Sequence, residues 1–287
     1  MRRPSSLALP AAALLLALAS PPVAAQPSAE ARARNLLANG AIGGAIAGVR
    51  ALIAGKREWR ALAAGFGGGV LTGVGKQVAA ARWVGAGLIG RQVGAAGTSL
   101  IYSATADTAV LFAPIGPATL ELRPRSPSRA RLRLNVAQTL TLVHAAGEGS
   151  AHVDRGATLS TGTPVFRRPR RKMPVSDNTN GYATPGAIFL ARDELRPGEM
   201  RRTVLPHETV HVVQWDAYSY LVTLPLERAV VRRLPGGGWL SRHVDVGLLA
   251  PLTVYAAAQR IGYQHQPWER EAYLLTTGSA QPPPLDP

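Results

Sequence analysis

Residues 207–215 read HETVHVVQW, with histidines at positions 207 and 211 and a glutamate directly after the first. Residues four apart lie on one face of a helix, so His207 and His211 would present two imidazoles to one metal ion. Glu208 would lie beside that ion, where a carboxylate can take a proton from a metal-activated water. The motif therefore predicts a metal site on a helix. The alternative is a surface helix with two solvated histidines.

A metal held by two histidines needs a third protein ligand, and residues 267–273, PWEREAY, offer one. Pro267 suits the first turn of a helix, and the carboxylates of Glu269 and Glu271 follow it closely. The chain has no cysteine, so disulfides and thiolate ligands are excluded. Any metal site must use histidines and carboxylates.

The two segments together resemble a known family. HETVHVVQ and the later EREAY resemble the gluzincin branch of zinc metallopeptidases. They are most similar to uncharacterised domains in the cores of extracellular contractile injection systems, which carry HExxHVxQ and then ExEAD. The resemblance spans residues 175–277 and implies that His207, His211 and Glu269 bind zinc. It also implies that Glu208 is the general base in peptide-bond hydrolysis.

One departure from the family pattern concerns support of the metal ligands. The family often has Asp after the Ala of ExEAD, where it supports a zinc-bound histidine, whereas this chain has Tyr273. Another acid, Asp216 or Asp245, is then expected in this role, or the site is weakened. Gluzincins also use a Tyr or His donor to the oxyanion, and the nearest candidates are Tyr263 and His265.

The start of the chain predicts export. A basic Met1-Arg2-Arg3, an apolar run over 7–18 and small residues up to Ala25 are typical of a secretory signal peptide, the alternative being an uncleaved anchor. We therefore expect the periplasm, the cell envelope or the exterior. The net charge of +15 favours an anionic membrane or an acidic envelope polymer as a partner. Nucleic acid is not expected as a partner, because the chain is predicted to be exported and its sequence shows no DNA- or RNA-binding signature.

The expected fold class is α+β. The predicted parts are a signal peptide (1–25), a Gly/Ala-rich helical subdomain (26–104), a zincin-like domain (105–280) and a disordered tail (281–287). Within the third part, residues 105–200 are predicted to be rich in strands and residues 201–280 to form the metal-binding helices.

Three helices are predicted over 31–54, 59–81 and 83–102. Their many glycines each disfavour an isolated helix by about 1 kcal/mol, so close backbone contact between helices must compensate. Such packing also suits a membrane, but Arg50, Lys76 and Arg91 lie in or near the apolar spans, each costing about 2.5–3.5 kcal/mol at mid-bilayer. Two interpretations of these helices remain: a soluble or membrane-peripheral subdomain, and membrane-inserted helices.

Short strands of a largely antiparallel central sheet are predicted over 108–113, 118–123, 130–136 and 139–145, with β character continuing over 156–166. Arginine alternates with apolar residues over 129–134, which predicts a half-buried strand with its arginines facing solvent. A strand over 186–190 is predicted to hold the backbone of a substrate, just before a helix over 203–220 that carries the histidines.

These features predict a secreted zinc-dependent metallopeptidase acting on a peptide or protein substrate. The alternative is a catalytically weak or inactive zincin-fold protein of the cell envelope, whose Gly/Ala-rich helices associate with a membrane or a partner.

Overall fold

The computed structural model describes residues 27–56, 58–106, 109–124, 129–149, 151–169, 180–191 and 203–280. The predicted signal peptide and the predicted C-terminal tail lie outside these residues. The α+β class is confirmed, because the described chain combines long helices with two small mixed sheets.

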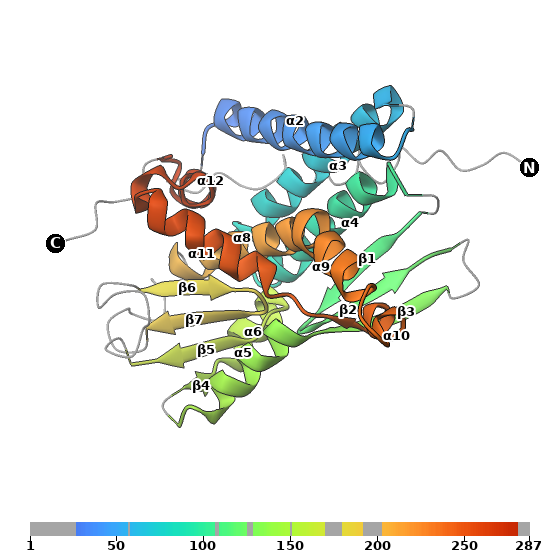
Figure 1. Ribbon diagram of the computed structural model, residues 1–287. Coiled ribbons are helices and arrows are strands. Elements are labelled where there is room, and N and C mark those ends of the chain that lie inside the picture. Colours follow the sequence, from blue (N-terminus) through green and yellow to red (C-terminus); the bar gives the residue numbers. More distant parts are fainter. Residues whose placement is uncertain are drawn as a thin grey trace, which may run out of the picture.

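The first three helices agree with the predicted ones: α2 (Ala29–Ile53), α3 (Glu58–Ala79) and α4 (Ala86–Ser103). Glycine lets them approach closely. A Cβ added at Gly43 would lie 2.4 Å from the carbonyl oxygen of Gly65, and one added at Gly69 would lie 2.1 Å from that of Asn39. Figure 1 shows α2 at the top of the molecule, lying across α3.

The cations of these helices form contacts within the protein. Arg91 donates a hydrogen bond of 2.6 Å to Asp216 of a later helix, and the Lys76 ammonium lies 2.8 Å from Glu271. The Arg50 guanidinium lies 4.5 Å from the centre of the Tyr102 ring. These contacts favour a subdomain packed on the rest of the chain. By length and composition alone, α2 is the one described helix that could cross a membrane.

The described strands form two four-stranded sheets, where one largely antiparallel sheet was expected. The first sheet has the order β1-β2-β3-β8 and the second β4-β5-β7-β6, and each has one parallel pair, β3 with β8 and β5 with β7. Their bounds are β1 (Leu111–Ile115), β2 (Ala118–Leu122), β3 (Ala130–Asn135), β4 (His152–Val153), β5 (Val165–Arg168), β6 (Gly181–Thr184), β7 (Ala187–Ala191) and β8 (Val244–Asp245).

Two of the predicted β segments are helical. The predicted strand over 139–145 is wrong, because this stretch belongs to α5 (Val136–Gly147), whose first turn is capped by the Asn135 side chain. The predicted β character over 156–166 is wrong in its first half, where α6 (Arg155–Thr161) begins at the capping carboxylate of Asp154. Both caps accept a backbone N–H at the start of a helix, which fixes where it begins.

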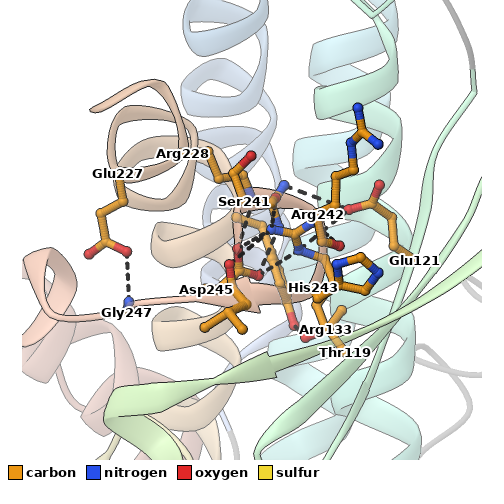
Figure 2. Close-up of polar contacts among 12 residues, drawn as sticks. Thr119, Glu121, Arg133, Glu227, Arg228, Ser241, Arg242, His243, Asp245 and Gly247 are labelled. Atoms are coloured by element: carbon orange, nitrogen blue, oxygen red, sulfur yellow. Dashed lines mark hydrogen bonds and ion pairs between the residues drawn. The ribbon is translucent and has the colours of Figure 1, made fainter. Parts of the chain in front are cut away.

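Strand β3 alternates as predicted, but its faces are reversed. Arg133 is 3% exposed, whereas Leu132 is 62% exposed. The reason is a buried charge network, shown in Figure 2, in which Arg133 and Arg228 both bind Asp245, and Glu121 lies close by. The prediction that the arginines face solvent therefore fails at Arg133.

The remaining helices follow the second sheet. They are α8 (Leu205–Tyr218), a π-helical turn (Ser219–Thr223), α9 (Leu224–Val231), α10 (Gly237–His243), α11 (Leu249–Arg260) and α12 (Pro267–Thr277). Figure 1 shows α8 between the N-terminal helices and the second sheet. Val210 packs with Ala80 and Ala272 on one side, and Val212 packs with Ile188 on the other. This burial on two sides fixes the helix that carries the histidines.

Candidate metal centre

The first turns of α8 bring both histidines of the motif to one point. Leu205 begins the helix, Pro206 occupies its first turn, and His207 and His211 follow with the predicted spacing. Their Nε2 atoms lie 3.1 Å apart, and both residues are buried. The alternative of two solvated histidines on a surface helix is therefore wrong.

The carboxylate of Glu269 completes the group from the first turn of α12. Its Oε2 lies 3.3 Å from Nε2 of His207, and its Oε1 lies 3.3 Å from Nε2 of His211. A carboxylate in this position is also favoured by the positive end of the α12 dipole. His207, His211 and Glu269 thus form a group that could hold a metal ion. We call it the metal group.

The spacing of the metal group suits a tetrahedral ion. Bonds of about 2.0–2.1 Å at tetrahedral angles place neighbouring ligand atoms about 3.3 Å apart. The observed separations are 3.1, 3.3 and 3.3 Å. Oε2 of Glu269 is buried and lacks a hydrogen-bond partner, which a bound cation would satisfy. The donor set of two imidazoles and one carboxylate fits the group that the resemblance implies.

The electrostatics of the metal group follow from burial and mutual charge. Burial lowers the pKa of His207 despite its contact with Glu269. Burial would also lower the pKa of His211, but the Glu269 charge and hydrogen bonds outweigh it and raise that pKa to about 9. The histidines in turn hold the pKa of Glu269 below its ordinary value, against the opposing effect of burial. Protons and a metal ion would therefore compete for these lone pairs.

Glu208, which directly follows His207, lies against strand β6. It is 5% exposed, and its carboxylate accepts a hydrogen bond from the backbone N–H of Ala183. Burial raises the pKa of Glu208 to about 8. Gly181 lies against this side chain, since a Cβ added there would be 3.1 Å from Oε1 of Glu208.

The expectation that the strand over 186–190 holds a substrate is wrong. This strand is β7, which is fully buried and pairs with β5 on one side and β6 on the other. The edge strand beside α8 is β6. At its centre, the carbonyl of Ala183 accepts a hydrogen bond of 3.2 Å from Trp215, while its N–H binds Glu208. Helix α8 itself therefore occupies this part of the edge.

The support of His211 comes from Gln214, not from an aspartate. Asp216 binds Arg91, and Asp245 binds Arg133 and Arg228, so both expected candidates are engaged elsewhere. Oε1 of Gln214 lies 2.7 Å from Nδ1 of His211 and accepts a hydrogen bond from it.

The amide of Gln214 is oriented by Glu271 and the backbone. Its Nε2 donates to Oε2 of Glu271 at 2.7 Å and to the carbonyl of Trp268 at 3.1 Å, and both are acceptors only. The Gln214 oxygen therefore faces His211, which leaves the Nε2 lone pair of His211 free for a metal.

Glu271 connects this support to the N-terminal helices. It accepts hydrogen bonds from Lys76 of α3 and from Asn35 and Asn39 of α2, at 2.8–2.9 Å. Burial alone would raise the pKa of Glu271, but the Lys76 charge and the asparagine hydrogen bonds lower it to about 2. Glu269 and Glu271, two residues apart on α12, thus bind different partners: Glu269 contacts the histidines, and Glu271 contacts Gln214 and the N-terminal helices.

Replacement of Gln214 by Ala should weaken metal binding about 10- to 100-fold, the usual effect of removing a partner of a metal-binding histidine. Competition with a chromophoric chelator measures this affinity. Gln259→Ala, at an exposed position of α11, is the matched control and should bind metal as the wild type does. Equal affinity in both variants would contradict the role given to Gln214.

The two predicted oxyanion donors, Tyr263 and His265, differ in their contacts with the metal group. The Tyr273 ring lies 4.5 Å from the His207 ring, and the Tyr263 hydroxyl lies 3.4 Å from that of Tyr273. Burial and then the Glu269 charge raise the pKa of Tyr263, so it stays a protonated donor. His265 is exposed, and no described contact joins it to the metal group. Tyr263 is thus the better placed of the two predicted donors.

The spacing of the supporting residues along the sequence carries a signal of their roles. Gln214 lies three residues after His211, a spacing that puts two side chains side by side on a helix. Glu271 lies two residues after Glu269, a spacing that separates them. Its partner on α3, Lys76, is distant in sequence and could not be identified this way.

No family model, characterised protein or solved structure shows a significant match to this chain. The relationship to gluzincins therefore stays a prediction from residues 207–214 and 269–273. The geometry of the metal group is the observation from which function can be argued.

Proposed function

We propose that this chain is an exported, zinc-dependent peptide hydrolase of the gluzincin type. The observation that supports this most directly is the convergence of two imidazole nitrogens and one carboxylate at separations of 3.1–3.3 Å. The chain would bind zinc through His207, His211 and Glu269. A buried carboxylate adjoining the histidines, Glu208, supplies the base that this chemistry requires.

In the proposed reaction, zinc, when bound, acts as a Lewis acid that acidifies a water molecule. The carboxylate of Glu208 accepts a proton from this water as the oxygen attacks the peptide carbonyl carbon. The same carboxylate then gives the proton to the leaving nitrogen as the C–N bond breaks. Burial holds the pKa of Glu208 at about 8, and a cation bound in the metal group would lower this pKa and so favour the basic form. The Tyr263 hydroxyl is the candidate donor to the developing oxyanion.

Metal content tests the proposal first. We expect one zinc ion per purified chain by mass spectrometry, and loss or strong weakening of binding in Glu269→Ala, because two ligands rarely hold zinc tightly. Glu58→Ala, an exposed glutamate of α3, is the control and should keep the ion. If the wild type neither contains zinc nor takes it up on addition, the proposed function fails.

A second candidate function is that of a metal-binding envelope protein without useful hydrolytic activity. Two observations favour it: both backbone groups of Ala183 on edge strand β6 are engaged by α8, and the metal-group side chains are only 9–14% exposed. A zinc-loaded wild type that cleaves members of a diverse peptide library, with cleavage stopped by a chelator, supports the hydrolase. Full metal occupancy with no cleavage of any member supports the second candidate.

A further inference from the structure

The outer side of α2 is an apolar stripe without a partner among the described residues. Ala38, Ile42, Ala45, Val49 and Ile53 recur at spacings of three and four, which places them on one face of the helix. Ile42 is 60% exposed and Ile53 is 81% exposed, although most isoleucines in folded proteins are buried. The opposite side of α2 is filled by its close contact with α3.

Helix α3 adds exposed apolar residues beside this stripe. Trp59, Leu62 and Phe66 are exposed large apolar residues at the start of α3. Leu62 lies directly against α2, since a Cβ added at Gly48 would be 2.7 Å from its Cδ2. We call the combined surface the α2–α3 face; its large members are Ile42, Val49, Leu52, Ile53, Trp59, Leu62 and Phe66. Apolar patches of this kind on a protein surface mark interaction sites.

Charge is distributed around the α2–α3 face in a way that suits an anionic surface. Between Arg34 and Lys56, the one charged residue of α2 is Arg50, which turns inward over the Tyr102 ring. The described cations near the two ends are Arg32, Arg34, Lys56 and Arg60, and the described carboxylates there are Glu30 and Glu58. Arg34 pairs with Glu30 at the surface, and the Lys56 ammonium donates a hydrogen bond to the carbonyl of Thr105. The Arg60 guanidinium lies 5.2 Å from the Trp59 ring centre, so a cation and an interfacial aromatic residue adjoin at one edge.

The inner contacts of α2 favour a helix that lies on a membrane over one that crosses it. Asn35 and Asn39 donate hydrogen bonds to the buried Glu271, and Gly43 touches the backbone of α3 at Gly65. Crossing a bilayer would require α2 to leave these partners and to bring the asparagines into hydrocarbon, which is costly. The outer side alone can enter lipid while every inner contact is kept.

We propose that the α2–α3 face docks the protein onto an anionic lipid bilayer, with α2 lying in the plane of the interface. The apolar residues enter the boundary between headgroups and acyl chains, and the cations at the two ends contact anionic headgroups. The net charge of +15 adds a longer-range attraction to the same surface. This role is independent of whether the metal group is catalytic.

The test is co-sedimentation of the purified mature protein with vesicles made of equal parts phosphatidylglycerol and phosphatidylcholine. We expect binding at low salt, weaker binding at high salt, and little binding to phosphatidylcholine alone. The double variant Ile42→Gln/Ile53→Gln should bind about tenfold more weakly, because it removes exposed apolar surface and leaves the inner contacts intact. Leu159→Gln is the matched control, since Leu159 on α6 is 76% exposed and lies outside this face.

Several outcomes would overturn the proposal. They are equal vesicle affinity of the double variant and the Leu159→Gln control, equal binding to neutral and anionic vesicles, and absence of binding at low salt. Size-exclusion chromatography of the same variants tests a second copy of the chain as the occupant. A wild-type dimer that the double variant alone converts to a monomer, without any change in vesicle binding, would assign the face to self-association.

Discussion

Replacement of Glu208 by Gln is expected to slow peptide hydrolysis about 10²- to 10⁴-fold while one metal ion stays bound. Glutamine has nearly the same shape as glutamate and still offers an oxygen to the N–H of Ala183. It cannot accept a proton from water near neutral pH. The three residues of the metal group are unchanged, so mass spectrometry should find the metal content of the wild type.

The informative comparison is between kcat/KM and metal content in the same preparations. Glu58→Gln, an exposed glutamate far along the chain from the metal group, is the control and should match the wild type in both. Wild-type turnover in Glu208→Gln would remove the base assignment. Loss of the metal in this variant would instead give Glu208 a structural role, in which its bond to Ala183 holds α8 against β6.

Local patterns predicted the parts of this molecule that local physics determines. The three Gly/Ala-rich helices agree with prediction within a few residues at each end, because their length and composition leave few other arrangements. The histidine helix was predicted over 203–220, and α8 occupies Leu205–Tyr218. The positions of His207, His211 and Glu269 around one point agree with what their spacing and the gluzincin resemblance imply.

Predictions failed where a helix cap or a partner distant in sequence overrides the pattern of a short segment. Residues 139–145 contain Thr, Leu and Val, which suit a strand, yet the Asn135 cap starts a helix directly after β3. Strand β3 alternates correctly, but Arg133 points inward because carboxylates on β2 and β8 are already there. The support of His211 by Gln214 depends on Glu271 and, through it, on Lys76, which is 195 positions away from Glu271.

The inward-facing Arg133 and Arg228 belong to a buried charge cluster. Asp245 accepts hydrogen bonds of 2.8 Å from Nε and from an NH₂ group of Arg228, and bonds of 3.0 and 2.7 Å from the same groups of Arg133 (Figure 2). Arg133 also donates to the backbone carbonyls of Ser241 and Arg242. One carboxylate thus joins β3, β8 and α9, and all three charged side chains are buried. Removing it would leave two arginines facing each other without their main counter-charge.

Replacement of Asp245 by Asn should therefore lower the free energy of unfolding by about 3–5 kcal/mol. The matched control is Glu30→Gln, which removes a carboxylate from an exposed pair with Arg34 and should cost about 0–1 kcal/mol. Urea unfolding followed by circular dichroism measures both. Equal midpoints for the two variants would contradict a structural role for the buried network.

The pH dependence of this difference provides an independent check. Burial would raise the pKa of Asp245, but hydrogen bonds and charge from Arg228 and Arg133 outweigh it and hold the pKa below its ordinary value. A carboxyl group with a depressed folded-state pKa contributes stability that is present above about pH 4 and is lost as the pH falls through the folded-state pKa. The stability gap between the wild type and Asp245→Asn should thus be constant near neutral pH and narrow below about pH 4. A gap that instead widens in acid would show that the carboxylate is disfavoured in the folded protein, and that the arginines are held by their backbone contacts.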